Sequence, residues 1–373
     1  MIAEMKELYD NRVQLAEDWK RSGGKVLGYF NALTPEELIF AAGLLPVQVL
    51  SSKRKISQAG SVLPEFLCTN PKDWLEQALA GELDYLDGVA MSHVCEALRG
   101  FYGVWKRNAN MPRSFFLQIP SSSGEEAKKY FLQELTLLKI FLEEISGQEV
   151  TNDRLLHAIE VYNNHRTLMR QLYDLRQRPG SSISGRDIIN TIKAGLVIPK
   201  NLHNDKLTQL IRHYGGSEQV QPENGALKLY ISGITLDETE TIIETIEALG
   251  GQVVSDDFCF GLRYCWEHVK VDGDPLESLA EHYLKKIPFP GKYSMGLMAD
   301  QVTEMVSTSQ ADGMIWVVEK YCDPYLFHAP ILLRKVEEKG IKMLSLEAEE
   351  AGNPSRLRMK IEAFMESLQE DLL

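Results

Sequence analysis

The sequence predicts an α/β protein built from two parallel-sheet lobes that are joined by a helical segment. Strands alternate with helices in residues 25–123 and again in residues 225–349, and such alternation indicates parallel strands with helices on both faces of the sheet. Long helical patterns without strands fill residues 124–224. The length of 373 residues supports this division, since single cores stop growing near roughly 250–300 residues.

Each expected element of the first half has a local signal. A polar amphipathic helix over residues 1–24 ends at two glycines, which stop helices. Thr34 is predicted to cap a helix that has Pro35 at its first position, Glu36 and Glu37 in its first turn, and Gly43 at its end. Strands are expected at 26–30, 46–50, 87–92 and 114–120, and further helices at 71–81 and 96–108.

The same alternation restarts at Ala226. Strands are expected at 227–232, 252–255, 313–318 and 342–346, and helices at 236–249, 275–286, 299–309 and 326–339. The segment between the lobes contains helical patterns at 124–146, 152–178 and 184–194. An amphipathic helix at 354–370 lies within a separate C-terminal region, residues 350–373.

Composition excludes several classes of function. The net charge of −13 argues against broad binding to nucleic acid, and no apolar run approaches the roughly 20 residues of a membrane span. The charged N-terminal pattern lacks the apolar core of a signal peptide, so we expect a cytoplasmic protein. There is no G-x-x-x-x-G-K-[ST] phosphate loop, no G-x-G-x-x-G after a strand and no G-x-S-x-G elbow.

The two halves repeat one pattern. Asp87-Gly88 opens an apolar run that leads to Cys95, and Asp312-Gly313 opens another that leads to Cys322. Each cysteine therefore follows the C-terminal end of a central strand. Open parallel sheets bind their ligands at this edge, so we interpret both cysteines as candidate ligand-binding residues.

The five cysteines do not form a disulfide framework, since their number is odd and they are spread along a long chain. Cys68, Cys95 and Cys322 each follow an apolar segment and form the sharper set. Three converging thiolates suit an iron–sulfur cube with one open iron, or a zinc ion with one open site, and spacing alone does not separate these. Cys259 and Cys265 form a C-x5-C pair, which is too loose for a zinc or redox motif.

The other candidates have structural interpretations beside functional ones. Arg99 and Arg263 lie near cysteines and could each hold a ligand phosphate or a structural carboxylate. Glu36 and Glu37 are interpreted as first-turn helix acids, and His93 as a packed or capping histidine. The aromatic residues within 101–105 are expected in the core.

Several segments together resemble the benzoyl-CoA reductase / 2-hydroxyacyl-CoA dehydratase subunit family. The opening combines Gly28-Tyr29-Phe30 with the run from Thr34-Pro35 to Pro46. The other matching segments are 87–99, 256–264, 274–280, 312–324 and 356–366, so the resemblance covers nearly the whole chain in order.

The resemblance implies a fold, a cofactor and partners. It implies two Rossmann-like or flavodoxin-like lobes with a [4Fe-4S] cluster between them, held by Cys68, Cys95 and Cys322. It also implies a homologous cluster-bearing partner subunit, a separate ATP-hydrolysing iron–sulfur activator and an acyl-CoA substrate. Relatives with a double-cubane cluster use an additional cysteine that has no match here, so Cys259 and Cys265 are expected not to be ligands.

The resemblance leaves two reactions open. Residues 152–177, 194–199 and 203–204 look closest to the smaller cluster-bearing subunits of ATP-dependent benzoyl-CoA reductases, which favours ring reduction. Residues 256–264 and the stretch from Pro275 look as much like 2-hydroxyacyl-CoA dehydratase subunits. A double-cubane-type reductase, a non-catalytic companion subunit and a zinc protein are the remaining alternatives.

Overall fold

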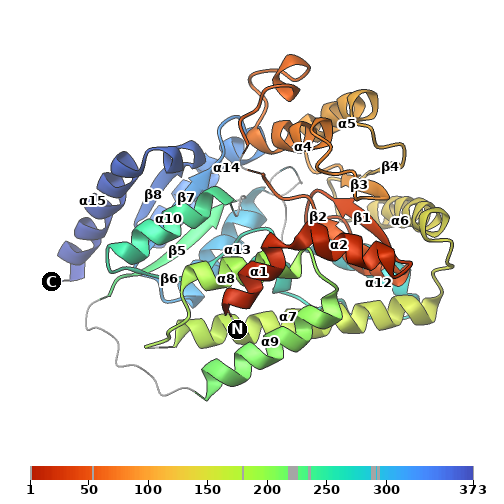
Figure 1. The fold of residues 1–373 in the computed structure, drawn as a ribbon. Coiled ribbons are helices and arrows are strands. Elements are labelled where there is room, and N and C mark those ends of the chain that lie inside the picture. Colours follow the sequence, from red (N-terminus) through yellow and green to blue (C-terminus); the bar gives the residue numbers. More distant parts are fainter. Residues whose placement is uncertain are drawn as a thin grey trace.

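The computed structural model confirms the α/β prediction with two parallel sheets of four strands each (Figure 1). It describes residues 2–52, 54–178, 180–216, 226–233, 237–286, 291 and 295–372. The first sheet has the order β2-β1-β3-β4 and comprises β1 (Lys25–Tyr29), β2 (Leu44–Gln48), β3 (Gly88–Ser92) and β4 (Ser114–Leu117). The second has the order β6-β5-β7-β8 and comprises β5 (Lys228–Gly233), β6 (Gln252–Asp256), β7 (Gly313–Val318) and β8 (Met343–Glu347).

Helices surround both sheets. Those of the first half are α1 (Ile2–Asp10), α2 (Arg12–Arg21), α3 (Glu36–Ala41), α4 (Thr69–Leu79) and α5 (Glu96–Asn108). The middle of the chain forms α6 (Glu125–Ser146), α7 (Asn152–Gln177), α8 (Gly185–Gly195) and α9 (Lys200–Gly215). The second half forms α10 (Asp237–Ala248), α11 (Leu262–Cys265), α12 (Pro275–Lys285), α13 (Met295–Thr308), α14 (Asp323–Glu338) and α15 (Pro354–Leu372). None of the described helices is long and apolar enough to cross a membrane.

The structure differs from the expected elements at several places, besides shifts of a few residues at element ends. The N-terminal region forms two helices that are broken at Asn11, and α9 was not expected at all. The last helix of the second lobe begins at Asp323 rather than Leu326, because Pro324 is tolerated in a first turn. Pro35, rather than Thr34, occupies the N-cap of α3, and the expected 224/225 boundary lies outside the described residues.

The two sheets use the same device to fix their register. Asp87 lies directly before β3, and its Oδ2 accepts a hydrogen bond of 2.8 Å from the backbone N–H of Val26. Asp312 lies directly before β7, and its Oδ2 accepts one of 2.7 Å from the N–H of Lys228. In each sheet, the aspartate of the repeated Asp-Gly pair therefore joins two neighbouring central strands: β3 to β1 in the first sheet and β7 to β5 in the second.

The glycines of these pairs allow a helix to pack closely on each sheet. A Cβ on Gly88 would lie 2.9 Å from Ile145 of α6, and a Cβ on Gly313 would lie 2.7 Å from Leu368 of α15. Helices α6 and α15 thus take equivalent positions on the two sheets. The sequence predicts residues 125–146 as part of the joining segment. No sequence pattern indicates that this helix, α6, packs on the first sheet.

A fully buried ion pair connects the three parts of the chain. Glu37 of α3 pairs with Arg166 of α7, and both side chains are completely removed from solvent. Tyr283 of α12 donates a hydrogen bond of 2.7 Å to the other carboxylate oxygen of Glu37. Beside them, Lys200 pairs with Glu36 at 3.1 Å. Glu36 and Glu37 lie in the first turn of α3, as the sequence predicts, and both are in addition buried in ion pairs, which the sequence did not indicate.

The ion pair determines the ionisation of Glu37. Burial by itself raises the pKa of Glu37, but the adjacent Arg166 guanidinium outweighs this effect and lowers the pKa to about 2. Because this value lies below that of an unfolded glutamate, ionisation of Glu37 stabilises the folded state above about pH 4.5. That contribution is lost as the pH falls from about 4.5 toward 2.

Replacement of Glu37 by Gln is expected to destabilise the protein strongly, because it leaves Arg166 buried without a counter-charge. The free energy of unfolding at pH 7, measured by urea denaturation, should fall by about 3–5 kcal/mol. The difference in unfolding free energy between wild type and Glu37→Gln should decrease as the pH is lowered below about 4.5.

The matched control is Glu281→Gln, which removes the solvent-accessible ion pairs of Glu281 of α12 with Lys128 of α6 and with Lys285. This change should alter the unfolding free energy little, because solvent screens such pairs. Equal effects of the two substitutions would contradict the role assigned to the buried pair.

Candidate metal centre

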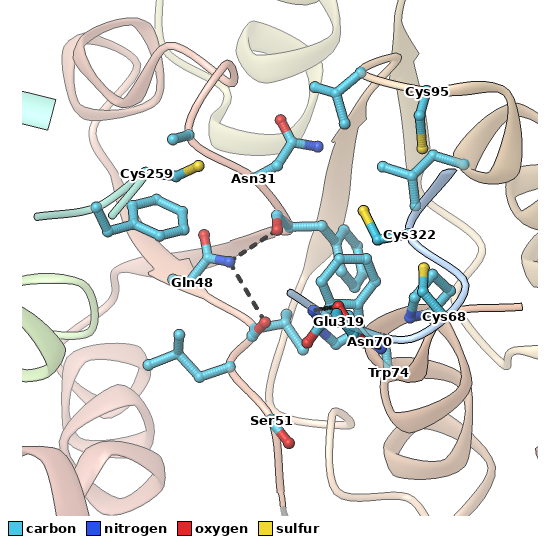
Figure 2. Close-up of a pocket in the computed structure, with 18 residues that line it drawn as sticks. Asn31, Gln48, Ser51, Cys68, Asn70, Trp74, Cys95, Cys259, Glu319 and Cys322 are labelled. Atoms are coloured by element: carbon cyan, nitrogen blue, oxygen red, sulfur yellow. Dashed lines mark hydrogen bonds between the residues drawn. The ribbon is translucent and has the colours of Figure 1, made fainter. Parts of the chain in front are cut away.

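Cys68, Cys95 and Cys322 come together between the lobes. Cys95 and Cys322 follow β3 and β7 closely, as the sequence predicts, whereas Cys68 lies well beyond the end of β2 and directly before α4. Each is half-buried and each occupies the N-cap position of a helix: Cys68 of α4, Cys95 of α5 and Cys322 of α14. All three line one cavity, and Figure 2 shows them on the same side of it. The positive ends of three helix dipoles therefore lie where thiolate charge would form.

Burial and neighbouring negatively charged groups raise the pKa of all three thiols. Burial is the largest cause for Cys68, followed by the Glu319 carboxylate and by Cys322 and Cys95. The pKa of Cys322 is raised by the same kinds of neighbours, and that of Cys95 chiefly by burial. Among the described residues no Lys, Arg or His lines the cavity. Three thiolates are therefore stable here only with an added cation, and the chemistry of this donor set fits an iron–sulfur cluster.

Glu319 joins the two lobes at this centre. It follows β7, and its Oε1 accepts hydrogen bonds from the backbone N–H of Thr69 at 2.6 Å and of Asn70 at 3.2 Å. Its Oε2 accepts a third, at 3.0 Å, from the Asn70 side chain. A residue of the second lobe thus caps the helix that begins at Cys68. Sequence reasoning missed Glu319, because its partners lie about 250 residues away.

The backbone before Cys322 has an unusual conformation. Tyr321 has φ of +64°, in the left-handed region that non-glycine residues rarely adopt. Such strain is concentrated at functional sites, where the surrounding structure enforces it. Here the enforced turn follows Glu319 directly and brings Cys322 back to the start of α14.

The two remaining cysteines have different surroundings. Cys259 is buried and lines the same cavity, on the side opposite the other three in Figure 2. Cys265 is fully buried outside the cavity, and its thiol donates to the backbone carbonyl of Leu262 at 3.4 Å. That neither is a ligand remains a prediction. In the described part of the chain, no three His, Cys, Asp or Glu side chains lie close enough together to coordinate a single metal ion.

The other candidates from the sequence have structural partners. Arg99 pairs with Glu96 on the exposed face of α5, and buried Arg263 pairs with Asp257 at 2.7 Å. Neither arginine lines the cavity. His93 packs on Phe116 with 5.6 Å between ring centroids, in agreement with a packed histidine. Phe101 and Trp105 are buried in the core, as expected.

Lys286 is a second residue that sequence reasoning missed. It is buried directly after α12, and its Nζ lies 3.4 Å from the carbonyl oxygen of Ala32, a residue that lines the cavity. Burial, followed by the nearby Arg166 charge, lowers the pKa of Lys286 to about 8. An amine with this pKa can hold or release a proton near neutral pH, behind the cavity wall.

Comparisons with known proteins identify the family of the chain. A family model described as "2-hydroxyglutaryl-CoA dehydratase, D-component" matches residues 31–368. The chain is 27% identical to one subunit of the benzoyl-CoA reductase of Thauera aromatica, over 99% of this chain and 98% of that protein. It is also 27% identical to the (R)-phenyllactyl-CoA dehydratase beta subunit of Clostridium sporogenes, over 98% of both chains.

A third relative is the beta subunit of the (R)-2-hydroxyglutaryl-CoA dehydratase of Acidaminococcus fermentans, at 25% identity over 99% of both chains. These matches extend over the two lobes, the three converging cysteines and the joining helices alike. They confirm the family that the sequence motifs indicate. The chain belongs to the 2-hydroxyglutaryl-CoA dehydratase D-component family, which includes subunits of both acyl-CoA dehydratases and a benzoyl-CoA reductase.

Proposed function

We propose that the chain is a [4Fe-4S] subunit of an oxygen-sensitive enzyme that delivers single low-potential electrons to an acyl-CoA thioester, and that the reaction is ring reduction of the benzoyl-CoA reductase type. The observation that carries this proposal is the convergence of Cys68, Cys95 and Cys322 on one cavity between the lobes. The cavity contains no cationic side chain among the described residues, so its thiols require a metal cation to ionise.

In this proposal the three cysteines hold the cluster. A bound [4Fe-4S] cluster supplies one-electron transfer, and three protein thiolates leave one iron open. The protein's own part is to bind, orient and shield. The N-termini of α4, α5 and α14 stabilise the thiolates, Glu319 holds Cys68 against the second lobe, and the apolar wall limits access of water.

The proposal includes partners. The named relatives are subunits of larger enzymes, which supports assembly with a homologous cluster-bearing subunit. The sequence carries no phosphate loop, so the ATP-driven step is assigned to a separate iron–sulfur activator. The same reasoning assigns the protein to the cytoplasm, where an activator and a CoA thioester would both be available.

Dehydration of a 2-hydroxyacyl-CoA is the second candidate reaction. The phenyllactyl-CoA dehydratase relative matches at the same 27% identity as the reductase relative. Both reactions require an electron of very low potential at a thioester-bound group. They differ in the fate of that electron, because a dehydratase recovers it after each turnover whereas a reductase consumes it.

Replacement of any one of Cys68, Cys95 or Cys322 by Ala is expected to remove most of the iron from anaerobically purified protein. Each thiolate supplies one of only three protein bonds to a cluster with about four irons per chain. Iron analysis and the visible absorption spectrum provide the measurement.

The double variant Cys259→Ser/Cys265→Ser is the matched control and should keep its iron and its spectrum. Full iron loading in Cys95→Ala, or about eight irons per wild-type chain, would refute a single three-cysteine cluster. Iron loss from the double variant would instead favour the double-cubane alternative.

The amount of ATP used per product separates the two reactions. With partner subunit and activator present, a ring reductase should hydrolyse ATP in stoichiometric proportion to product, since its electrons are consumed. A trace of ATP that sustains many turnovers would assign the complex to the dehydratases. Turnover by this chain alone would contradict both candidates.

A further inference from the structure

Gln48 places an unpartnered hydrogen-bond acceptor at the cavity. It is the last residue of β2, it lines the cavity and only 4% of its surface is exposed. Its Oε1 is buried and has no hydrogen-bond partner among the described residues. Figure 2 shows Gln48 on the side of the cavity opposite Cys68, Cys95 and Cys322.

The orientation of the Gln48 amide is fixed by its neighbours. Its Nε2 donates to the carbonyl oxygen of Phe30 at 2.9 Å and, more weakly, to that of Val49 at 3.5 Å. A rotated amide would turn Oε1 toward these two carbonyl oxygens, which cannot donate. The backbone N–H of Gln48 is also held, by the carbonyl of Leu196 at 2.8 Å. The oxygen therefore faces away from the carbonyl oxygens of Phe30 and Val49.

An acceptor in this position is unfavourable unless a ligand satisfies it. Most residues around the cavity are apolar, including Phe30, Leu50 and Val94, and a buried acceptor without a donor destabilises the folded state. The cavity measures about 110 Å³, which leaves room for several atoms of a ligand. A neutral amide oxygen cannot balance a buried charge, so the matching group is a neutral N–H or O–H donor.

We propose that Gln48 contributes to substrate binding by accepting a hydrogen bond from a neutral donor of the acyl-CoA thioester. This inference rests on the function proposed above. Two parts of a thioester carry such a donor. One is the amide N–H of the cysteamine arm, which every CoA thioester has, and the other is a hydroxyl group next to the thioester carbonyl.

The test measures binding without turnover. The complex with its partner subunit is purified anaerobically, and the affinities for benzoyl-CoA and lactoyl-CoA are measured by equilibrium dialysis without activator or ATP. Gln48→Met keeps the length of the side chain and removes the acceptor, so it should weaken binding about 3- to 10-fold, for both thioesters if the cysteamine amide donates and for lactoyl-CoA alone if the hydroxyl donates.

Gln77→Met is the matched control. Gln77 is also buried and its Nε2 donates to the carbonyl of Leu50 at 2.9 Å, but it does not line the cavity. Its replacement disturbs the same segment after β2 and should leave the affinity unchanged. An equal loss of affinity in both variants would overturn the inference, because support of the segment would then explain the effect.

Pairs of ligands identify the donor. If the cysteamine amide donates, a benzoyl-CoA analogue with an ester oxygen in place of that N–H should bind more weakly than benzoyl-CoA to wild type, and equally to Gln48→Met. If a hydroxyl donates, wild type should prefer lactoyl-CoA to propionyl-CoA, and Gln48→Met should lose that preference. If wild type distinguishes neither pair, the inference is overturned, even if the variant does not fold.

Iron content separates failure of this inference from failure of the proposed function. Wild-type protein that holds neither iron nor acyl-CoA would contradict the proposed function itself. Protein that holds both, with affinities for benzoyl-CoA and lactoyl-CoA that Gln48→Met leaves unchanged, would contradict only the role of Gln48.

Discussion

The arrangement of the whole molecule depends on one carboxylate and one guanidinium that share a site without water. Glu37 comes from the first lobe, Arg166 from the helical segment, and Tyr283, which completes the group, from the second half of the chain. Removal of either charge from its partner inside a protein is strongly unfavourable, so these three segments are held in one arrangement. The loop that carries Phe30 and Ala32 lies directly before α3, and the walls of the cavity are fixed with it.

An internal repeat of the two lobes places two of the three cysteines of the candidate metal centre. Asp87 and Asp312 set the register of the two sheets in the same way, and the strands that follow them lead to Cys95 and Cys322. The third thiol breaks the symmetry. Cys68 follows β2, whereas Cys259, which follows β6 in the other lobe, is buried on the opposite side of the cavity. Repetition thus explains two of the three converging cysteines, and the asymmetry of the lobes explains why the centre lies toward one side.

Much of this could be predicted from the sequence, because strand order and strand ends follow from local patterns. Parallel sheets bring their carboxyl ends to one edge, so cysteines placed there meet regardless of the details of packing. The buried state of Glu36 and Glu37 could not be predicted, because a Thr-Pro-Glu-Glu helix start looks the same on a surface as in a core. Their partners, like those of Glu319 and Lys286, lie far along the chain. The free acceptor of Gln48 depends on the rotation of one amide, which no sequence pattern encodes.

The cap that Glu319 provides for α4 has a consequence for biosynthesis. Cys68 and Cys95 leave the ribosome early, but Glu319 and Cys322 follow only after more than half of the chain has been added. Until the second lobe has folded and docked, the start of α4 lacks its carboxylate and the cavity lacks its third thiol. A nascent chain can therefore expose two thiols without a formed site. If the proposed cluster is bound here, the factor that loads it must act on the nearly finished protein, or else protect those two thiols while the remainder is made.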